Sequence, residues 1–341
     1  MPTGPSSDHA AFLAEAQAHL AAWREPRAAA PGPEAETLRR AYLDLLKLCL
    51  CDLAGTSTIS VGAMPDGTVM SRELRGEARR MRAAGLDWPL QGLTMVGLDR
   101  LDDLQRCVES VVADGVEGDL IEAGSWRGGA SILMRAALDT LGEERTVWVA
   151  DSFEGFPADT SLDAYDFLAA PLDEVKESFA RLGCDRRVRF VPGFFEQSLP
   201  PLAGERWAIV RLDADTYAPT RQALRALYPG LVPGGYLVLD DYGSFPGCRE
   251  AVDEFRAEHG ISEPIEKVDP TCVRWRREST APIEIGPDPA AAEPPPRAMA
   301  RSRETHVPTE REVELARELA AAEAAIGLRP WLRRKLSRGA A

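Results

Sequence analysis

Two pairs of aspartates could carry chemistry together. Asp213 and Asp215 follow one apolar run, and Asp240 and Asp241 follow another. If both runs are parallel strands, their carboxyl ends meet at one edge of a sheet, and we expect the four carboxylates to converge there. Four carboxylates in one cleft repel one another unless a cation lies among them, and oxygen ligands suit a hard ion such as Mg²⁺. The spacing therefore predicts a magnesium site.

A glycine-rich stretch is the second chemical signal. The apolar residues 120–121 lead into the pattern Glu-x-Gly-x-x-x-Gly, formed by Glu122, Gly124 and Gly128, and an apolar helix is expected over 130–138. The dinucleotide fingerprint has a glycine where Glu122 stands. A carboxylate suits a cationic sulfonium and an amino group, whereas a pyrophosphate needs bare backbone N–H groups. The pattern favours S-adenosylmethionine over NAD, although such glycines also fit a simple turn.

Two further strand ends could complete a nucleotide site. Residues 146–151 form an apolar run that ends at Asp151, a position from which a carboxylate can accept hydrogen bonds from both ribose hydroxyls. A helix-capping role is the alternative for Asp151. After a third run over 187–192, Phe195 could flank an adenine ring, and core packing explains this residue equally well.

Alternating strands and helices must position these residues. Strands are expected around 120–121 and over 146–151, 187–192, 207–212 and 236–239, and helices over 130–138, 164–182, 219–227 and 248–259. Such alternation predicts an α/β fold with a doubly wound, mostly parallel sheet. The carboxyl edge of that sheet would gather the turns described above into one crevice.

The ends of the chain are expected to lie outside this fold. The predicted parts are an N-terminal extension over 1–34 with a loosely attached helix over 8–23, a main domain over 35–278, a proline-rich linker over 279–308 and a helical tail over 309–341. The main domain is expected to begin with an amphipathic helix over 35–53, followed by a polar loop over 55–68. The apolar stripe of that helix is Leu38, Tyr42, Leu45, Leu46, Cys49 and Leu53. The basic tail is expected to be a solvated helix, with contact to a partner or a membrane surface as the alternative.

Composition narrows the partners and the compartment. The 341 residues carry a net charge of −14, which argues against nucleic acid as the main partner. The six cysteines are scattered without a Cys-x-x-Cys pair, as in a reduced cytoplasmic enzyme. The sequence contains neither a secretory leader pattern nor an apolar run long enough to cross a membrane. Its four histidines do not suggest a Ser/His triad or a histidine zinc site.

From about Tyr42 to Arg276 the sequence also resembles a known family, the macrocin O-methyltransferases, which methylate sugar hydroxyls of antibiotics. The matching stretches are Thr-Met-Val-Gly at 94–97, Asp-Leu-Ile-Glu-Ala-Gly-Ser-Trp-Arg-Gly-Gly at 119–129, Ala-Asp-Ser-Phe-Glu-Gly at 150–155, Leu-Asp-Ala-Asp at 212–215 and Leu-Asp-Asp-Tyr-Gly at 239–243. Residues 161–172 match the family poorly, so the resemblance does not extend to a lid over the acceptor.

The resemblance implies a class I S-adenosylmethionine-dependent methyltransferase fold and a set of site residues. It implies a Mg²⁺ held by Asp213, Asp240 and Asp241, with Asp215 as general base, and it makes a homo-oligomer plausible. The residues expected around the cofactor, from the resemblance and from the patterns above, are Thr94, Met95, Glu122, Gly124, Ser125, Arg127, Gly128, Asp151, Ser152, Phe153, Glu154, Gly155 and Phe195.

The sequence therefore predicts a Mg²⁺-dependent, S-adenosylmethionine-dependent O-methyltransferase that acts on a sugar hydroxyl of a glycosylated small molecule or glycan. A catechol-type enzyme acting on a phenol is the nearest alternative. An NAD-dependent oxidoreductase and a non-enzymatic binding protein are alternatives of other classes. The acceptor sugar and the methylated hydroxyl are not identified by the sequence.

Overall fold

The computed structural model describes residues 7–22, 34–63, 69–156 and 168–286. The chain divides into two compact units, Met1–Asp288 and Pro289–Ala341, and all described residues belong to the first. The predicted tail and most of the predicted linker lie outside the described residues. The described residues 279–286 include Ile283 and Ile285, which pack partly buried against the core, so the compact unit continues past residue 278.

Helices and strands alternate along most of this unit. The helices are α1 Ser7–Ala22, α2 Glu34–Leu50, α3 Arg80–Ala83, α4 Leu98–Ala113, α5 Gly129–Thr140, α6 Leu172–Arg181, α7 Phe195–Ser198, α8 Tyr217–Leu227 and α9 Pro246–Glu258. The strands are β1 Ser57–Ala63, β2 Val69–Arg75, β3 Trp88–Pro89, β4 Asp119–Ala123, β5 Val147–Asp151, β6 Val188–Pro192, β7 Trp207–Leu212, β8 Leu231–Leu239, β9 Glu266–Lys267 and β10 Val273–Arg276. None of the described helices has the length and apolar character needed to cross a bilayer.

The main sheet has seven strands in the order β6-β5-β4-β7-β8-β10-β9. The first five strands are parallel to one another, and β10 runs antiparallel to both of its neighbours, β8 and β9. The strand order reverses between β4 and β7, which is where an open α/β sheet forms its crevice. The predicted α/β class with a mostly parallel sheet is therefore confirmed.

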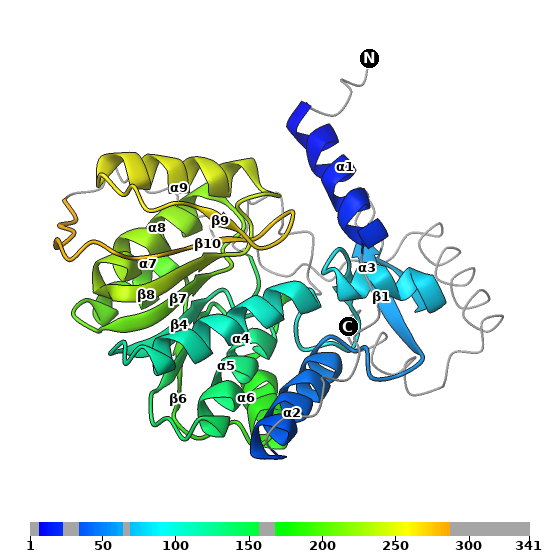
Figure 1. Cartoon of the computed structure of the whole chain (residues 1–341). Helices are drawn as coiled ribbons and strands as arrows, with labels where there is room; N and C mark the ends of the chain where they lie inside the picture. The colour runs from blue at the N-terminus through cyan, green and yellow to red at the C-terminus, as the bar shows by residue number, and fades with distance from the viewer. Residues whose placement is uncertain (1–6, 23–33, 64–68, 157–167, 287–341) are drawn as a thin grey trace, which may run out of the picture. The chain divides into compact units, whose positions relative to one another are not determined.

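Helices cover both faces of this sheet (Figure 1). One core cluster packs α2, α4, α5 and α6 against one face, through residues such as Leu101 and Leu133. A second cluster packs α8 and α9 against the other face, through Leu224 and Phe255. All six residues of β7 are buried, as expected for a strand covered on both faces. The sheet is thus a rigid base for the turns at its carboxyl edge.

A second, smaller sheet replaces much of the loop expected over 55–68. Its order is β2-β1-β3, and all of its pairs are antiparallel. The prediction of a loop was wrong at β1, where the β-branched Thr58, Ile59 and Val61 support a strand between polar neighbours. The polar residues that suggested a loop belong instead to a strand of this three-stranded sheet.

Two helix predictions also need correction. Of the helix expected over 164–182, residues 164–167 lie outside the described residues. Among the described residues, α6 begins at Leu172, because Pro171 stands directly before it as the capping residue. In α2 the predicted apolar stripe is mostly exposed, since Leu38 and Leu45 are 64% and 58% accessible. The buried face carries Leu43 and Leu50 together with Leu46, which was part of the predicted stripe. Leucines stand on both faces of α2, so periodicity alone did not identify the packed one.

The N-terminal helix α1 is observed close to the range expected for it. His19 approaches Asp99 of α4 to 3.2 Å, and Lys267 of β9 forms an ion pair with Glu15. Ala16 is buried between these contacts. The helix therefore contacts the rest of the unit through an ion pair, a polar contact and a small apolar one.

Candidate active site

A cavity of about 690 Å³ lies at the carboxyl edge of the main sheet, a volume in the usual range for small-molecule sites. Most of the residues predicted from the sequence line it. They are Thr94, Met95, Glu122, Gly124, Ser125, Asp151, Ser152, Gly155, Phe195, Asp213, Asp215, Asp240 and Asp241. Arg127, Gly128, Phe153 and Glu154 are outside the lining set. The structure therefore places the aspartate pairs and the glycine-rich stretch around one cavity.

The glycines after β4 are needed for contacts with protein. A Cβ on Gly124 would lie 1.7 Å from the carbonyl oxygen of Asp213, and the residue has φ +89°. A Cβ on Gly128, at φ +81°, would lie 2.6 Å from the ring of Phe179 in α6. At these two positions the backbone thus lies closer to Asp213 and to α6 than a residue with a side chain would permit.

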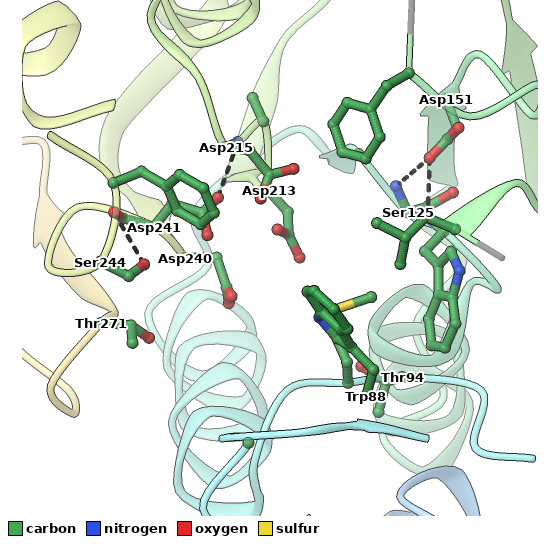
Figure 2. A pocket seen from close by; sticks show the side chains of 18 of the residues that line it. Trp88, Thr94, Ser125, Asp151, Asp213, Asp215, Asp240, Asp241, Ser244 and Thr271 are labelled. Atoms are coloured by element: carbon green, nitrogen blue, oxygen red, sulfur yellow. Dashed lines mark hydrogen bonds between the residues drawn. The ribbon is translucent and has the colours of Figure 1, made fainter. Parts of the chain in front are cut away.

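Asp151 ties two turns of the site together. Its Oδ2 accepts hydrogen bonds from the backbone N–H groups of Ser125 at 2.8 Å and Trp126 at 2.9 Å, and its Oδ1 accepts one from Phe153 at 2.8 Å. Figure 2 shows the Asp151 carboxylate facing the Ser125 turn. A carboxylate has about four acceptor positions, so these bonds leave little capacity for ribose hydroxyls. The structure assigns Asp151 first to shaping the turn.

Two polar atoms of the same turn have no hydrogen-bond partner in the described part of the chain. They are the Ser125 hydroxyl and the indole Nε1 of Trp126, and both are buried while their residues line the cavity. Buried polar groups are almost always hydrogen-bonded in native proteins. A polar ligand next to this turn would supply the missing partners. The turn therefore fits a cofactor with hydrogen-bonding groups.

Three carboxylates form a compact cluster across the cavity. The carboxylate oxygens of Asp213, Asp215 and Asp241 lie within 4.8 Å of one another, and the backbone N–H of Asp215 donates to Asp241 at 3.0 Å. Figure 2 shows these residues gathered on the side of the cavity opposite Ser125. A hard divalent cation is the natural partner for such a set of oxygen donors. The donor set fits the predicted metal.

Asp240 is held differently from the other three aspartates. One of its oxygens accepts a hydrogen bond from Arg211 at 2.5 Å, and the other accepts one from Arg100. Arg211 also binds Glu122 at 2.5 Å and Asp213 at 3.0 Å, and all of these groups except Asp213 are deeply buried. Glu122 and Asp240 are thereby fixed on either side of one guanidinium. The sequence prediction placed Asp240 among the metal ligands, and the structure brings Asp215 nearer to Asp213 and Asp241.

The proton affinity of the cluster is raised by burial. Burial and the nearby Asp213 charge raise the pKa of Asp215 to about 8, and burial together with Asp240 raises the pKa of Asp213 to about 6. The pKa of Asp241 is also raised, by burial and by Asp215. Burial raises the pKa of Glu122 to about 7 against the opposing effect of Arg211. Cavity residues with such shifts are candidates for proton transfer or cation binding.

Backbone strain marks the same turns. Trp126, Phe153 and Asp215 have φ values of +48°, +58° and +55°, and they follow β4, β5 and β7 respectively. Left-handed backbone at residues other than glycine is uncommon and concentrates at functional sites. The strained Asp215 also donates its backbone N–H to Asp241. These turns are held in place by the surrounding fold.

Four predicted cofactor residues have other contacts. Arg127 donates to the carbonyl oxygens of Pro89, Leu90 and Gly92 at 3.2, 3.1 and 2.9 Å, and burial lowers its pKa to about 10. Gly128 packs on α6, and Glu154 is exposed. Phe153 is buried against the ring of Phe190. The geometry gives Arg127, Gly128 and Phe153 a supporting place behind the cavity wall and leaves Glu154 at the surface.

Several lining residues were not predicted from the sequence. They include Ser60, Val61, Arg72, Leu74, Leu86, Trp88, Arg100, Trp126, Phe194, Phe245 and Thr271. The first six come from the small sheet and its connections, for which the sequence has no motif. Arg211, which binds the cavity carboxylates, had a detectable signal, because an arginine in the otherwise apolar β7 requires a buried carboxylate partner.

Comparison with protein families gives a match over residues 40–277, to the model described as macrocin O-methyltransferase. This span includes both the main sheet and the small sheet. It begins inside α2 and ends after β10.

Two curated proteins illustrate the similarity. The 8-demethyl-8-(2,3-dimethoxy-alpha-L-rhamnosyl)-tetracenomycin-C 4'-O-methyltransferase of Streptomyces olivaceus is 43% identical over 269 residues, which are 74% of this chain and 98% of that protein. The mycinamicin III 3''-O-methyltransferase of Micromonospora griseorubida is 42% identical over 251 residues, or 69% and 96% of the two chains.

A solved structure shares the fold. The O-methyltransferase NovP superposes with a TM-score of 0.62 at 36% sequence identity, covering 71% of this chain and all of the NovP chain.

Proposed function

Because the chain belongs to the macrocin O-methyltransferase family, we propose that it transfers the methyl group of S-adenosylmethionine to a sugar hydroxyl of a glycosylated natural product. It is an O-methyltransferase with the class I S-adenosylmethionine-dependent fold, which sets aside the NAD-dependent and non-enzymatic alternatives. The observation that carries the proposal is one cavity that joins the Ser125 turn to the Asp213, Asp215 and Asp241 cluster.

The cofactor end of the cavity is proposed to lie at the turns after β4 and β5. The Ser125 hydroxyl and the indole N–H of Trp126, which have no partner among the described residues, offer hydrogen bonds there, and Met95 and Phe195 offer apolar surface. Glu122 would offer carboxylate oxygens to the amino group of the cofactor, with its position fixed by Arg211 and Ser131. Such a mixture of apolar walls and a few oriented polar groups is typical of cofactor sites.

A Mg²⁺ ion is proposed to lie at Asp213 and Asp241, with Asp240 as the third ligand. Asp213 and Asp241 belong both to the predicted ligand set and to the observed cluster. The oxygens of Asp240 retain lone pairs beyond the bonds to Arg100 and Arg211. When bound, a divalent cation supplies the charge that makes a sugar hydroxyl more acidic and orients it toward the methyl group.

Asp215 is proposed as the general base. A base must lie within hydrogen-bond reach of the hydroxyl that it deprotonates, so it must stand close to the residues that hold that hydroxyl. The Asp215 oxygens meet this condition, because they lie within 4.8 Å of those of Asp213 and Asp241. Its raised pKa, about 8, gives it affinity for a proton near neutral pH.

An acceptor assay tests the proposed function. The full chain is incubated with methyl-labelled S-adenosylmethionine and with the unmethylated glycosides named for its relatives: the rhamnosyl-tetracenomycin, mycinamicin III and demethyldecarbamoylnovobiocin. A simple catechol serves as the phenolic comparison. Transfer to a sugar hydroxyl supports the proposal. Transfer to the catechol alone would replace it with the phenol-specific alternative.

The remaining predictions concern assembly and location. We propose a homo-oligomer that works in the cytoplasm, with a small-molecule glycoside as acceptor and no nucleic-acid partner. Five of the six cysteines are buried and all six are free thiols, which fits a reducing compartment. Sedimentation of the purified chain tests the oligomeric state.

A further inference from the structure

The small sheet supplies one wall of the cavity. Ser60 and Val61 of β1, Leu74 of β2 and Trp88 of β3 all line the same cavity as the acid cluster. In Figure 2, Trp88 lies across the cavity from Asp213 and Asp215. A molecule that presents a hydroxyl to the acid cluster would therefore have its remaining surface next to this wall.

The wall depends on contacts made from outside the main sheet. Only two residue pairs join β3 to β1, Ser60 with Pro89 and Val61 with Trp88. A sheet this small is not stable alone and needs support from its surroundings. The position of Trp88 must therefore be set by the side chains that connect β1, α3 and β3.

One buried arginine makes that connection. Arg82 of α3 is completely buried and forms a two-point ion pair with Asp87, from Nε at 2.8 Å and from Nη2 at 2.5 Å. It also donates to Thr58 Oγ1 at 3.3 Å and to the Ile59 carbonyl oxygen at 3.4 Å, both in β1. The Thr58 hydroxyl in turn donates to Asp52 at 2.6 Å, beyond the end of α2.

The planar guanidinium suits this task. Its fork matches both oxygens of a carboxylate while a further N–H reaches a third group, which fixes orientation as well as distance. Asp87 is directly followed by Trp88 in the chain. The ion pair that holds Asp87 therefore also constrains the position of the Trp88 backbone. A lysine at position 82 would keep the charge and lose the fork.

We propose that Trp88 is an acceptor-binding residue and that Arg82 is its positioning residue, holding the small sheet so that the indole forms the surface on which the acceptor lies. This inference rests on the proposed function, because it names the part of the cavity that takes the acceptor. Arg82 itself does not line the cavity and acts through Asp87 and β1. The cofactor end, at the turns after β4 and β5, shares none of the Arg82 contacts, and it meets β3 through Arg127, which donates to the main-chain carbonyl oxygens of Pro89 and Leu90.

The test separates acceptor binding from cofactor binding. Arg82→Met should raise the acceptor KM at least about tenfold, while the cofactor Kd measured by calorimetry stays within about twofold. Arg82→Lys should give a smaller rise in KM, because the charge is kept. Trp88→Ala should raise the same KM without touching the ion pair, which keeps the test decisive if the Arg82 variants fail to fold.

Arg135 provides a matched control. It is also completely buried, on α5, where it binds Asp139 at 2.9 Å and the carbonyl oxygens of Glu143 at 3.0 Å and Arg145 at 2.5 Å, away from the cavity lining. Arg135→Met should lower the thermal midpoint and leave the acceptor KM unchanged. Equal KM changes in the Arg82 and Arg135 variants would mean that Arg82 is merely structural.

The outcomes also distinguish this inference from the proposed function. The acceptor is the compound that the wild-type chain methylates, whether glycoside or catechol. If only the catechol is methylated, the proposed function fails, and the KM comparison still decides the role of the wall. An unchanged acceptor KM in Trp88→Ala would overturn the inference with the proposed function intact. Absence of transfer to every acceptor would overturn both.

Discussion

The backbone N–H of Asp215 donates a hydrogen bond to the carboxylate of Asp241 at 3.0 Å, so the turn after β7 is joined to the turn after β8. Asp215 itself has left-handed backbone, at φ +55°. Because the joint is made by the main chain, substitution of the Asp215 side chain leaves it in place. The side chain can therefore be tested apart from the architecture of the turn.

Asp215→Asn should slow catalysis with little effect on the cofactor. The amide keeps the size of the side chain but cannot accept the hydroxyl proton, so kcat should fall by about 10²- to 10⁴-fold. Single-turnover rates and cofactor calorimetry provide the measurement. Recovery of the rate in excess Mg²⁺ would instead identify Asp215 as a metal ligand, as its place in the cluster with Asp213 and Asp241 allows.

Chelation should abolish turnover. Treatment with EDTA should remove activity and added Mg²⁺ should restore it, because the acid cluster needs a cation to hold an acceptor hydroxyl. Asp241→Asn should raise the Mg²⁺ concentration needed for half-maximal rate. Turnover that persists undiminished in EDTA would leave the carboxylates without a metal role.

The metal-free protein should lose stability as pH rises. An unfolded aspartate releases its proton near pH 4, whereas folded Asp215, with a pKa of about 8, retains it longer. Between these values the folded state binds more protons, so the free energy of unfolding decreases with pH, by up to about 1.4 kcal/mol per unit for one proton. Thermal midpoints from about pH 5 to 8 should show this slope, and Asp215→Asn should make it shallower, leaving the part due to the raised pKa values of Asp213 and Glu122. A midpoint that rises over this range would contradict the assignment.

Alanine substitutions at two glycines with similar φ values should separate the free-energy cost of backbone strain from that of steric overlap. Gly124→Ala should cost more than about 3 kcal/mol, because the new Cβ meets the Asp213 carbonyl oxygen at 1.7 Å. Gly142 has φ +72° and open space around its Cβ position, so Gly142→Ala should cost only about 1–2 kcal/mol from backbone strain. Urea unfolding of both variants gives the comparison. Equal losses would show that the Gly124 turn relaxes freely.

Shortening the chain should locate the end of the folded unit. A chain ending at residue 286 should keep full methyl transfer. A chain ending at 278 should lose about 1–3 kcal/mol, because it lacks the partly buried Ile283 and Ile285. It also lacks the Ala281 carbonyl oxygen that Arg277 binds at 2.6 Å. Thermal unfolding distinguishes the two, and equal midpoints would restore residue 278 as the boundary.

The sequence predicted the parts of the fold that rest on local pattern. The strands from 120 to 239 and the convergence of Asp213, Asp215, Asp240 and Asp241 follow from apolar runs and from the geometry of parallel sheets. Contacts between distant residues were not predictable in this way. Arg100 and Asp240 are 140 residues apart, and no spacing rule connects them.

The glycine-rich turn shows a second limit of sequence reasoning. Gly124 and Gly128 were predicted to belong to a cofactor site, as part of the pattern that favours S-adenosylmethionine. Both Cβ positions instead face protein atoms, of Asp213 and of Phe179. A motif shows that a side chain is not tolerated at a position. It does not show which neighbour excludes it, because that neighbour comes from the tertiary structure.

The small sheet is one nearly continuous stretch of sequence, and this has a consequence for exchanging parts between related enzymes. Two arginines outside it bind its main chain: Arg100 binds the Gly85 carbonyl oxygen at 2.9 Å, and Arg127 binds those of Pro89 and Leu90. From within the segment, Thr58 and Arg79 reach back to Asp52 and to the Leu53 carbonyl oxygen. The three acceptors of the two outside arginines are main-chain atoms, which any sequence supplies. A segment spanning residues 57–90 could thus be transplanted from a homologue as a cassette, changing acceptor preference while the recipient keeps its own two anchoring arginines.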